Sequence, residues 1–233
     1  MVKDLIRYFG DRIEEKDKQA PEQGPVITIS REFGCPAKRI AEKLKKALTQ
    51  KNQYQDKKSA WKVISKEILV EAAKELKLKP SEIKYVFDYE KKRVFDEILS
   101  SQSKKYYKSD RKIRQTIAKV IRSVANQGNV IIVGRGGIAI TKDIQKSFHV
   151  RLEAPIEWRA TMVSQIHKIS FSGAKELAIE IDQKRNHFRN QFEGKGTDYT
   201  VPDIRFNCMT LVDEEIVDAI LKVIEMKKIV KLS

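Results

Sequence analysis

The sequence predicts an α/β fold in which helices cover both faces of a parallel sheet. Short apolar runs rich in β-branched residues alternate along the chain with amphipathic helical stretches, as in parallel sheets that are buried on both faces. Two of these runs lead directly into loops that contain glycine and arginine. With 233 residues, the chain is long enough to bury a substantial core.

The composition excludes several classes of protein. Hydrophobic residues make up 41% of the chain, which argues against general disorder. Apolar runs stay short of the roughly 18 residues that a membrane helix needs, and early charges interrupt any signal peptide. Two cysteines and three scattered histidines give neither a disulfide framework nor a metal-ligand spacing. We therefore expect a cytoplasmic protein with no membrane partner and no metal bound by its side chains.

The net charge of +15 favours an anionic partner. Basic residues are densest between Ser101 and Ser123, where only Asp110 opposes them. A solvated helix face explains most such charge runs, and a phosphate-facing or nucleic-acid-binding surface is the alternative. The basic residues of this stretch are Lys104, Lys105, Lys108, Arg111, Lys112, Arg114, Lys119 and Arg122.

The elements can be taken in order from the N-terminus. Residues 1–24 form a charged appendage with one amphipathic stripe, and we expect it to pack on the domain or on a second subunit. The domain then begins with a strand at 26–30, a loop at 31–36, and a helix with Ile40, Leu44 and Leu48 on one stripe. Pro36 suits the first turn of that helix because its missing N–H is no loss there.

The middle of the chain is expected to be mainly helical. A second strand is predicted at 61–64 and helices over 66–123, with Gly128 and Asn129 ending the last of them. A buried strand at 130–133 follows and runs into the second glycine loop, Gly134 to Gly137. A strand at 148–152 and a helix starting at 154–157 come next.

The C-terminal part contains a long polar helix and a final strand-helix pair. The helix is expected from about 174 to 192, ahead of a Gly-Lys-Gly loop at 194–196. The last strand is predicted at 205–211 and the closing amphipathic helix at 213–230.

Phosphate is the expected ligand of the first loop. Ligands of parallel α/β sheets bind beyond the carboxyl ends of the strands, and the helix after this loop offers free N–H groups and the positive end of its dipole. Arg31, Lys38 and Arg39 add positive charge. The loop departs from a Walker motif, because Pro36 and Ala37 stand where the motif requires glycine and lysine.

The second loop admits another interpretation. Gly134 to Ala139 fits the Gly-x-Gly-x-x-Ala pattern of dinucleotide-binding folds, and Glu153 follows at about the expected distance. That motif should open a full helix, and the residues from Ile138 to Ile144 leave little room for one.

Six segments, taken together and in order, resemble the cytidylate kinase-like family. They are ITISREFG at 27–34, IAEKL at 40–44, ISKEILVEAA at 64–73, VIIVGRG at 130–136, VRLEAPIEWR at 150–159 and IDQKRNHFRNQF at 181–192. The resemblance covers residues 25–230 and implies a three-layer P-loop kinase-like fold for a domain at 25–233. It also implies a helical monophosphate-binding insert at about 61–127 and a lid at about 159–203.

The resemblance implies a set of site residues. The loop from Arg31 to Arg39 would cradle the phosphates of ATP, with Mg²⁺ accompanying the nucleotide, and Arg135 would grip the acceptor monophosphate. Where CMP kinases have Asp after the Gly-Arg pair, this chain has Gly136. The expected ATP-binding residues are Arg31, Gly34, Cys35, Lys38 and Arg39; the catalytic ones Lys38, Arg185 and Arg189; and the acceptor-binding ones Arg135, Arg159 and Asp182.

Three hypotheses of function follow. The first is a nucleoside-monophosphate kinase that transfers phosphate from ATP to CMP or a similar acceptor. The second is a nucleotide-binding protein without turnover, which the altered loop favours. The third is a nucleic-acid-binding module that uses the basic stretch up to Arg122. For Cys35, packing in the loop is expected rather than nucleophilic reactivity.

Overall fold

The computed structural model describes residues 24–52, 60–80, 110–190 and 201–230. The helix expected within 1–24 and the loop at 194–196 lie outside these ranges. The chain divides into two compact units, Met1–Pro21 with Lys66–Val124, and Glu22–Ser65 with Ala125–Ser233. The larger second unit contains the sheet.

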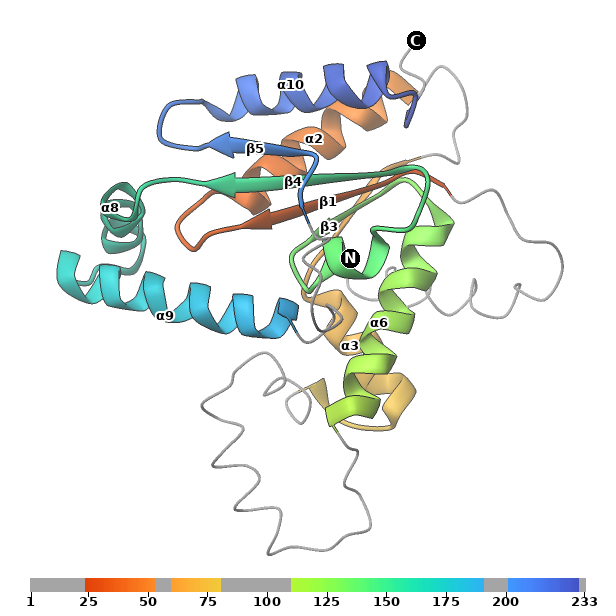
Figure 1. Ribbon diagram of the computed structural model, residues 1–233, viewed down its shortest axis with the longest axis horizontal. Helices are drawn as coiled ribbons and strands as arrows, with labels where there is room; N and C mark the ends of the chain where they lie inside the picture. The colour runs from red at the N-terminus through yellow and green to blue at the C-terminus, as the bar shows by residue number, and fades with distance from the viewer. Residues whose placement is uncertain (1–23, 53–59, 81–109, 191–200, 231–233) are drawn as a thin grey trace, which may run out of the picture. The chain divides into compact units, whose positions relative to one another are not determined.

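The sheet has five parallel strands in the order β2-β3-β1-β4-β5 (Figure 1). The central strand β1, Val26–Arg31, pairs in parallel with β3 and β4, so that Ile27 lies opposite both Ile131 and Phe148. The other strands are β2 at Lys62–Ile64, β3 at Val130–Val133, β4 at Ser147–Glu153 and β5 at Ile204–Asn207. The parallel sheet that the sequence predicts is therefore present.

Two helices cover one face of this sheet. They are α2, Ala37–Asn52, and α10, Asp213–Met226, and Figure 1 shows them next to each other. The apolar sides of these two helices pack on the side chains that alternate strand residues direct to this face of the sheet. The residues of this core include Ile27, Ile29, Ile40, Leu44, Phe148, Val150, Ile216 and Ile220.

The other face carries a short helix in the same unit. This helix, α7, spans Gly137–Thr141. A Cβ on Gly137 would lie 3.2 Å from Ile132 Cγ2 and 3.4 Å from Thr28 Cγ2, so α7 packs closely on the alternate residues of β1 and β3. Helices thus cover both faces. Five residues are too few for the full helix that a dinucleotide-binding motif should open, and this disfavours that interpretation.

Two further helices pack against each other, and the first of them lies beyond the carboxyl ends of the strands. These are α8, Ile156–His167, and α9, Phe171–Asn190, and in Figure 1 the arrowheads of β1 and β4 point to the side where α8 lies. The start of α9 was expected near residue 174. It begins earlier because Ser170 Oγ accepts a hydrogen bond from the N–H of Gly173, as an N-cap serine does.

The smaller unit contributes helices. Its described elements are α3, Glu67–Leu76, and most of α6, Asp110–Gln127. In α6 the apolar stripe is buried, whereas Arg111, Lys112 and Arg122 are exposed. Lys119 pairs with Glu75 of α3 at 2.7 Å. Within the described part of the basic stretch, the charges therefore lie on a solvated helix face.

Two predicted boundaries were wrong. Strand β5 ends at Asn207 instead of continuing to 211, because the carbonyl of Asn207 accepts the amide of Leu211 at 3.1 Å and its side chain accepts the amide of Met209 at 3.0 Å. Helix α10 ends at Met226 instead of 230, and Lys228 then adopts a left-handed φ of 54°.

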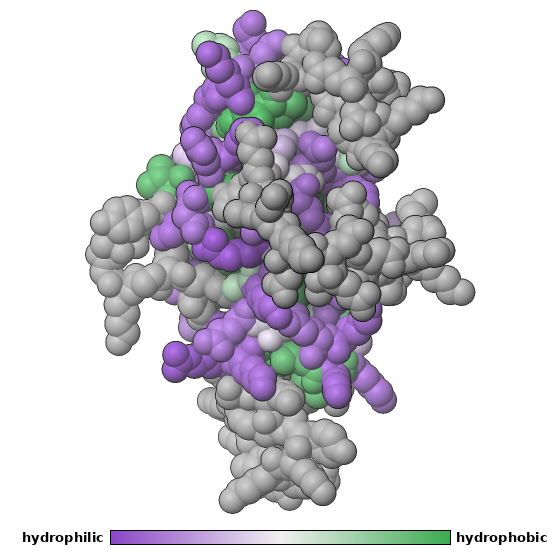
Figure 2. Space-filling view, turned by 90° about the vertical axis from the view of Figure 1, so that its right-hand side faces the viewer, coloured by the Kyte–Doolittle hydropathy of each residue, from purple (hydrophilic) through white to green (hydrophobic). Residues whose placement is uncertain are grey.

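The surface of the described residues is mainly polar. Hydrophilic residues dominate the face shown in Figure 2, and the hydrophobic ones form small separate patches there. No helix among the described residues combines the length and apolar character that crossing a bilayer requires.

Candidate functional site

The backbone of the first loop is folded so that most of its amides are used inside the protein. The N–H of Cys35 donates to the carbonyl of Glu32 at 3.3 Å, and the N–H of Ala37 donates to the carbonyl of Cys35 at 2.9 Å. Pro36 has no N–H to offer. The N–H of Glu32 is held by the carbonyl of Leu152 at 3.0 Å. The loop is therefore a poorer backbone cradle for phosphate than the sequence led us to expect.

Helix α9 clamps this loop from the side. Asp182 Oδ1 accepts the N–H of Phe33 at 2.8 Å, and Arg185 Nη1 donates to the carbonyl of Arg31 at 3.2 Å. The guanidinium of Arg185 also lies 5.4 Å from the centre of the Phe33 ring, within range of a cation–π interaction. Asp182 and Arg185 can act together because residues three apart share one face of a helix.

The buried guanidinium of Arg159 joins the loop to both helices of the pair. It donates from Nη1 to the carbonyl of Phe33 at 3.1 Å and to Asp182 Oδ2 at 2.7 Å, and from Nε to the carbonyl of Ala154 at 2.9 Å. Its Nε also lies 3.2 Å from Glu32 Oε2. These contacts favour a positioning role for Arg159; the substrate contact expected for it stays a prediction.

Gly34 allows the loop to pass close to α8. A Cβ on Gly34 would lie 3.0 Å from Arg159 Cβ and 3.1 Å from its carbonyl oxygen. The φ of Gly34 is +99°, a conformation that other residues rarely adopt. Glycine here therefore serves the fit between the loop and Arg159.

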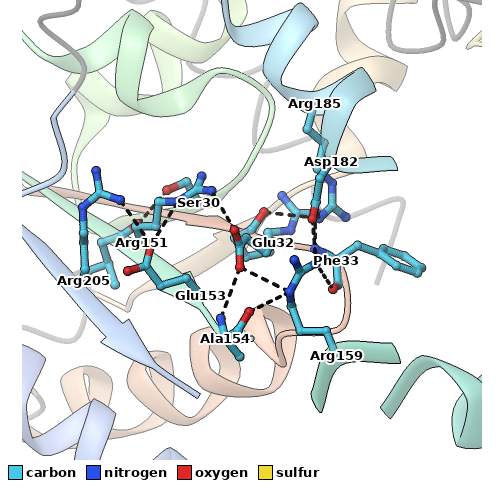
Figure 3. Close-up of polar contacts among 12 residues, drawn as sticks. Ser30, Glu32, Phe33, Arg151, Glu153, Ala154, Arg159, Asp182, Arg185 and Arg205 are labelled. Atoms are coloured by element: carbon cyan, nitrogen blue, oxygen red, sulfur yellow. Dashed lines mark hydrogen bonds and ion pairs between the residues drawn. The ribbon is translucent and has the colours of Figure 1, made fainter. Parts of the chain in front are cut away.

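Charges of alternating sign extend along the ends of the strands (Figure 3). Glu32 Oε1 lies 3.6 Å from Arg151 Nη2, and Glu153 Oε2 lies 3.7 Å from Arg151 Nε and 3.1 Å from Arg205 Nη1. Sequence reasoning missed Glu32 and Arg151, and it considered Glu153 only as the acidic residue of a dinucleotide-binding motif. The signal was present, since residues 151 and 153 share one face at the end of a strand.

Three arginines from separate elements converge at the two glycine loops. Arg31 ends β1, Arg135 follows β3, and Arg185 comes from α9. Burial and then the charges of Arg185 and Arg135 lower the pKa of Arg31 to about 9, and Asp182 partly offsets this. Burial likewise lowers the pKa of Arg185. Arg31 thus carries its positive charge close to two other arginines, and the charge of Asp182 offsets part of their effect on its pKa.

The second loop places Arg135 in a strained conformation. Gly134, Arg135 and Gly136 have consecutive φ values of 72°, 60° and 71°. Glycine adopts such values freely, whereas a left-handed arginine costs about 1–2 kcal/mol. Strain of this kind is often found at functional sites, and it supports a binding role for Arg135.

Two residues expected to bind ATP are directed elsewhere. Arg39 forms a two-pronged ion pair with Asp213 at the start of α10, through its Nε and through Nη2 at 3.0 Å from Oδ1. Cys35 interacts with Cys208, and this contact is the largest cause that raises the pKa of Cys35 while lowering that of Cys208. A raised pKa favours the inert thiol, which agrees with the packing role expected for Cys35.

For the two remaining predicted site residues, the structure gives only their position and exposure. Lys38 is exposed at the second position of α2, and Arg189 is half-buried one turn beyond Arg185 on α9. The structure thus brings together Arg31, Gly34, Arg135, Arg159, Asp182 and Arg185. The ligand-binding roles of all these residues stay predictions.

The described residues do not form a Mg²⁺ site by themselves. They contain no cluster of three or more His, Cys, Asp or Glu that could hold a metal ion. The carboxylates nearest the arginines, Glu32 and Asp182, are both engaged by arginine. Since Mg²⁺ in nucleotide sites is held largely by the phosphates, an accompanying ion would have to arrive with ATP.

Comparison with known proteins supports the fold and the family. The model of the cytidylate kinase-like family matches residues 26–202. A solved structure described as an uncharacterized protein from Eubacterium ventriosum ATCC 27560 is similar at a TM-score of 0.58, with 22% sequence identity over 86% of this chain and 98% of that one. The likeness to that structure shows the fold alone. No curated protein matches the chain.

Proposed function

The chain belongs to the cytidylate kinase-like family, and from this we propose that it binds nucleotide phosphates through Arg31, Arg135 and Arg185 and transfers the terminal phosphoryl group of ATP to CMP or a related acceptor. The observation that carries the proposal is the convergence of the three arginines. Arg185 bonds the carbonyl of Arg31 at 3.2 Å, and burial together with the charges of Arg185 and Arg135 lowers the pKa of Arg31 to about 9. A kinase-like, nucleotide-binding fold is what the family supports directly; the transfer and its acceptor are our proposal.

Electrostatics explains why such a cluster calls for a polyanion. Like charges that are gathered and partly buried destabilise one another, and an anion relieves that repulsion. Arginine suits the task because it stays charged and binds phosphate oxygens in a fork. A nucleotide phosphate chain, which carries several charged oxygens on adjacent phosphorus atoms, can contact all three guanidiniums together.

The transfer itself requires little covalent chemistry from the protein. An oxygen of the acceptor monophosphate attacks the terminal phosphorus of ATP, the bond from that phosphorus to the bridging oxygen breaks, and ADP leaves. Positioning and charge neutralisation supply the catalysis. We propose that Arg135 holds the acceptor phosphate, that Arg185 and Arg189 neutralise the transferred group, and that Lys38 provides the cation missing from position 37.

A second candidate is a nucleotide-binding protein without turnover. Two observations favour it. The amides of Glu32, Phe33, Cys35 and Ala37 are already bonded within the protein. Ala37, where a phosphate-loop lysine would stand, is buried at 3% exposure. The arginine cluster would then bind nucleotides for recognition alone.

Product formation separates the two candidates. The purified chain is incubated with ATP, Mg²⁺ and each nucleoside monophosphate, and binding is followed in parallel as a rise in melting temperature. Turnover supports the kinase, whereas a thermal shift without turnover supports the second candidate. Absence of both in folded protein rejects both.

Arg135→Ala provides the second test, with Arg205→Ala as its control. Each variant removes one positive charge, but Arg205 is 54% exposed and pairs with Glu153. Arg135→Ala should weaken nucleotide binding in both candidates and reduce the rate only in the kinase. Arg205→Ala should change neither. If both variants lost nucleotide binding equally, the loss would be explained by net charge and not by a specific role of Arg135.

A further inference from the structure

The carboxylate of Asp182 is surrounded by groups that suit an anionic ligand. Its Oδ1 accepts the N–H of Phe33 at 2.8 Å and its Oδ2 accepts Arg159 Nη1 at 2.7 Å (Figure 3). Arg185 Nη1 lies 3.5 Å from Oδ1. One loop amide and two guanidiniums are also the donors that protein sites present to phosphate oxygens.

The same carboxylate opposes the arginine cluster. The charge of Asp182 is felt by Arg31, where it acts against the effects of burial and of Arg185 and Arg135. A phosphate bound to Arg31 and Arg185 would therefore lie beside a like charge. The donors and the charge that a phosphate needs are partly committed to Asp182.

We propose that Asp182 is an internal anion that occupies the phosphate-binding groups of the free protein, so that a phosphate or pyrophosphate group binds by displacing it. The inference rests on the proposed function, because it assigns regulation to the same site. Displacement frees the N–H of Phe33 and Arg159 Nη1 from the carboxylate, and it removes the contacts by which Asp182 holds the first loop against α9.

The remaining contacts allow the site to open without unfolding. Arg185 still bonds the carbonyl of Arg31, and Arg159 still bonds the carbonyl of Ala154. The Phe33 side chain packs on a small cluster that contains Ala160, Val163 and Ala174. The loop and the helix pair therefore stay joined when the carboxylate leaves.

Asp182→Asn tests the proposal, with Glu180→Gln as the matched control. Both variants remove one negative charge from α9, but Glu180 is exposed and pairs with Lys184. Pyrophosphate is the probe because it lacks a sugar and base that Asp182 could contact directly. If the open form of the wild type is populated at about 10%, Asp182→Asn should bind pyrophosphate about tenfold more tightly in calorimetry.

The pyrophosphate affinity of Asp182→Asn is compared with that of the control variant. Glu180→Gln should bind pyrophosphate as the wild type does, apart from a small effect of net charge that salt screens. Affinity in Asp182→Asn that equals or falls below that of Glu180→Gln overturns the proposal. Absence of pyrophosphate binding in every variant also overturns it, since the donors would then not form an anion site.

Hydrogen exchange in the wild type gives a second measurement that does not depend on a variant. Amides of α9 should exchange faster when pyrophosphate is bound, because Asp182 no longer anchors the helix to the loop. Greater protection of α9 would overturn the displacement. The proposed function is judged separately, by binding and turnover of ATP and nucleoside monophosphates in the wild type. If Asp182→Asn bound pyrophosphate tightly but the wild type bound no nucleotide, the internal anion would be supported and the proposed function rejected.

Discussion

The guanidinium of Arg31 lies directly against the backbone of Gly134. A Cβ built on Gly134 would come within 1.8 Å of Arg31 Nη1. The side chain that ends β1 therefore fills the space that a side chain on the second loop would need. Through this contact the two glycine loops form one site.

Gly134→Ala should displace Arg31 and weaken phosphate binding. The φ of Gly134 is +72°, so the substitution should also lower the free energy of unfolding by about 1–3 kcal/mol. Pyrophosphate calorimetry and urea unfolding measure the two effects. Gly173→Ala is the control, because its Cβ would meet only Ser170 Oγ, at 3.2 Å. Unchanged affinity in Gly134→Ala would show that the position of Arg31 does not matter.

Arg135→Gly should change stability and binding in opposite directions. Relief of the left-handed strain should raise the free energy of unfolding by about 0.5–1 kcal/mol, whereas loss of the guanidinium should weaken nucleotide binding. Lys168→Gly relieves a similar φ of 54° at the end of α8 and should stabilise without affecting affinity. A fall in both properties of Arg135→Gly would contradict the strain argument.

Arg159→Met should be strongly destabilising. Arg159 is 7% exposed, and removing its guanidinium leaves Glu32 and Asp182 without their closest cation. The free energy of unfolding should therefore fall by about 3 kcal/mol, as for a broken buried pair. The exposed Arg205→Met should cost about 0–1 kcal/mol in the same urea titration. Similar costs for both variants would show that the network around Arg159 adds little to stability.

Arg39→Gln tests whether Arg39 stabilises the fold. The hydrogen bond from Arg39 holds the pKa of Asp213 below its usual range, so the pair contributes stability at neutral pH that is lost as the pH falls through the lowered pKa. The variant should lose on the order of 1 kcal/mol at pH 7, and less in acid. Lys45→Gln, which breaks only an exposed pair with Glu42, is the control. A difference that persists unchanged in acid would contradict this origin.

The sheet could be predicted from sequence because burial on both faces requires continuous apolar runs. The run at 130–133 coincides with β3, and the strand expected at 26–30 differs from β1 by one residue. The end of β5 was missed because a side chain of Asn207 closes the turn, and no glycine or proline marks it. A hydrogen bond between an asparagine side chain and nearby backbone competes with strand pairing, but the sequence pattern gives little sign of it.

The candidate site could be predicted only in part. Arginines at strand ends were expected to meet, since parallel strands share one carboxyl edge, and Arg31 and Arg135 do meet there. The partners of Arg39 and Phe33 could not be predicted from the sequence, because Asp213 and Asp182 are 174 and 149 residues away along the chain. Helix periodicity indicates which face of a helix is polar, but it does not identify the residue of another element that contacts this face.

Burial of Ala37 has a consequence for redesign. Its methyl group belongs to the core cluster shared by α2 and β1, and its amide is bonded to Cys35. Installing a lysine there would drive a flexible chain and an ammonium group into packed hydrocarbon, where ionisation is disfavoured. Restoring a conventional phosphate loop therefore requires rebuilding the turn around Pro36 together with its supporting layer, and a single exchange at position 37 would give a damaged core in place of a better catalyst.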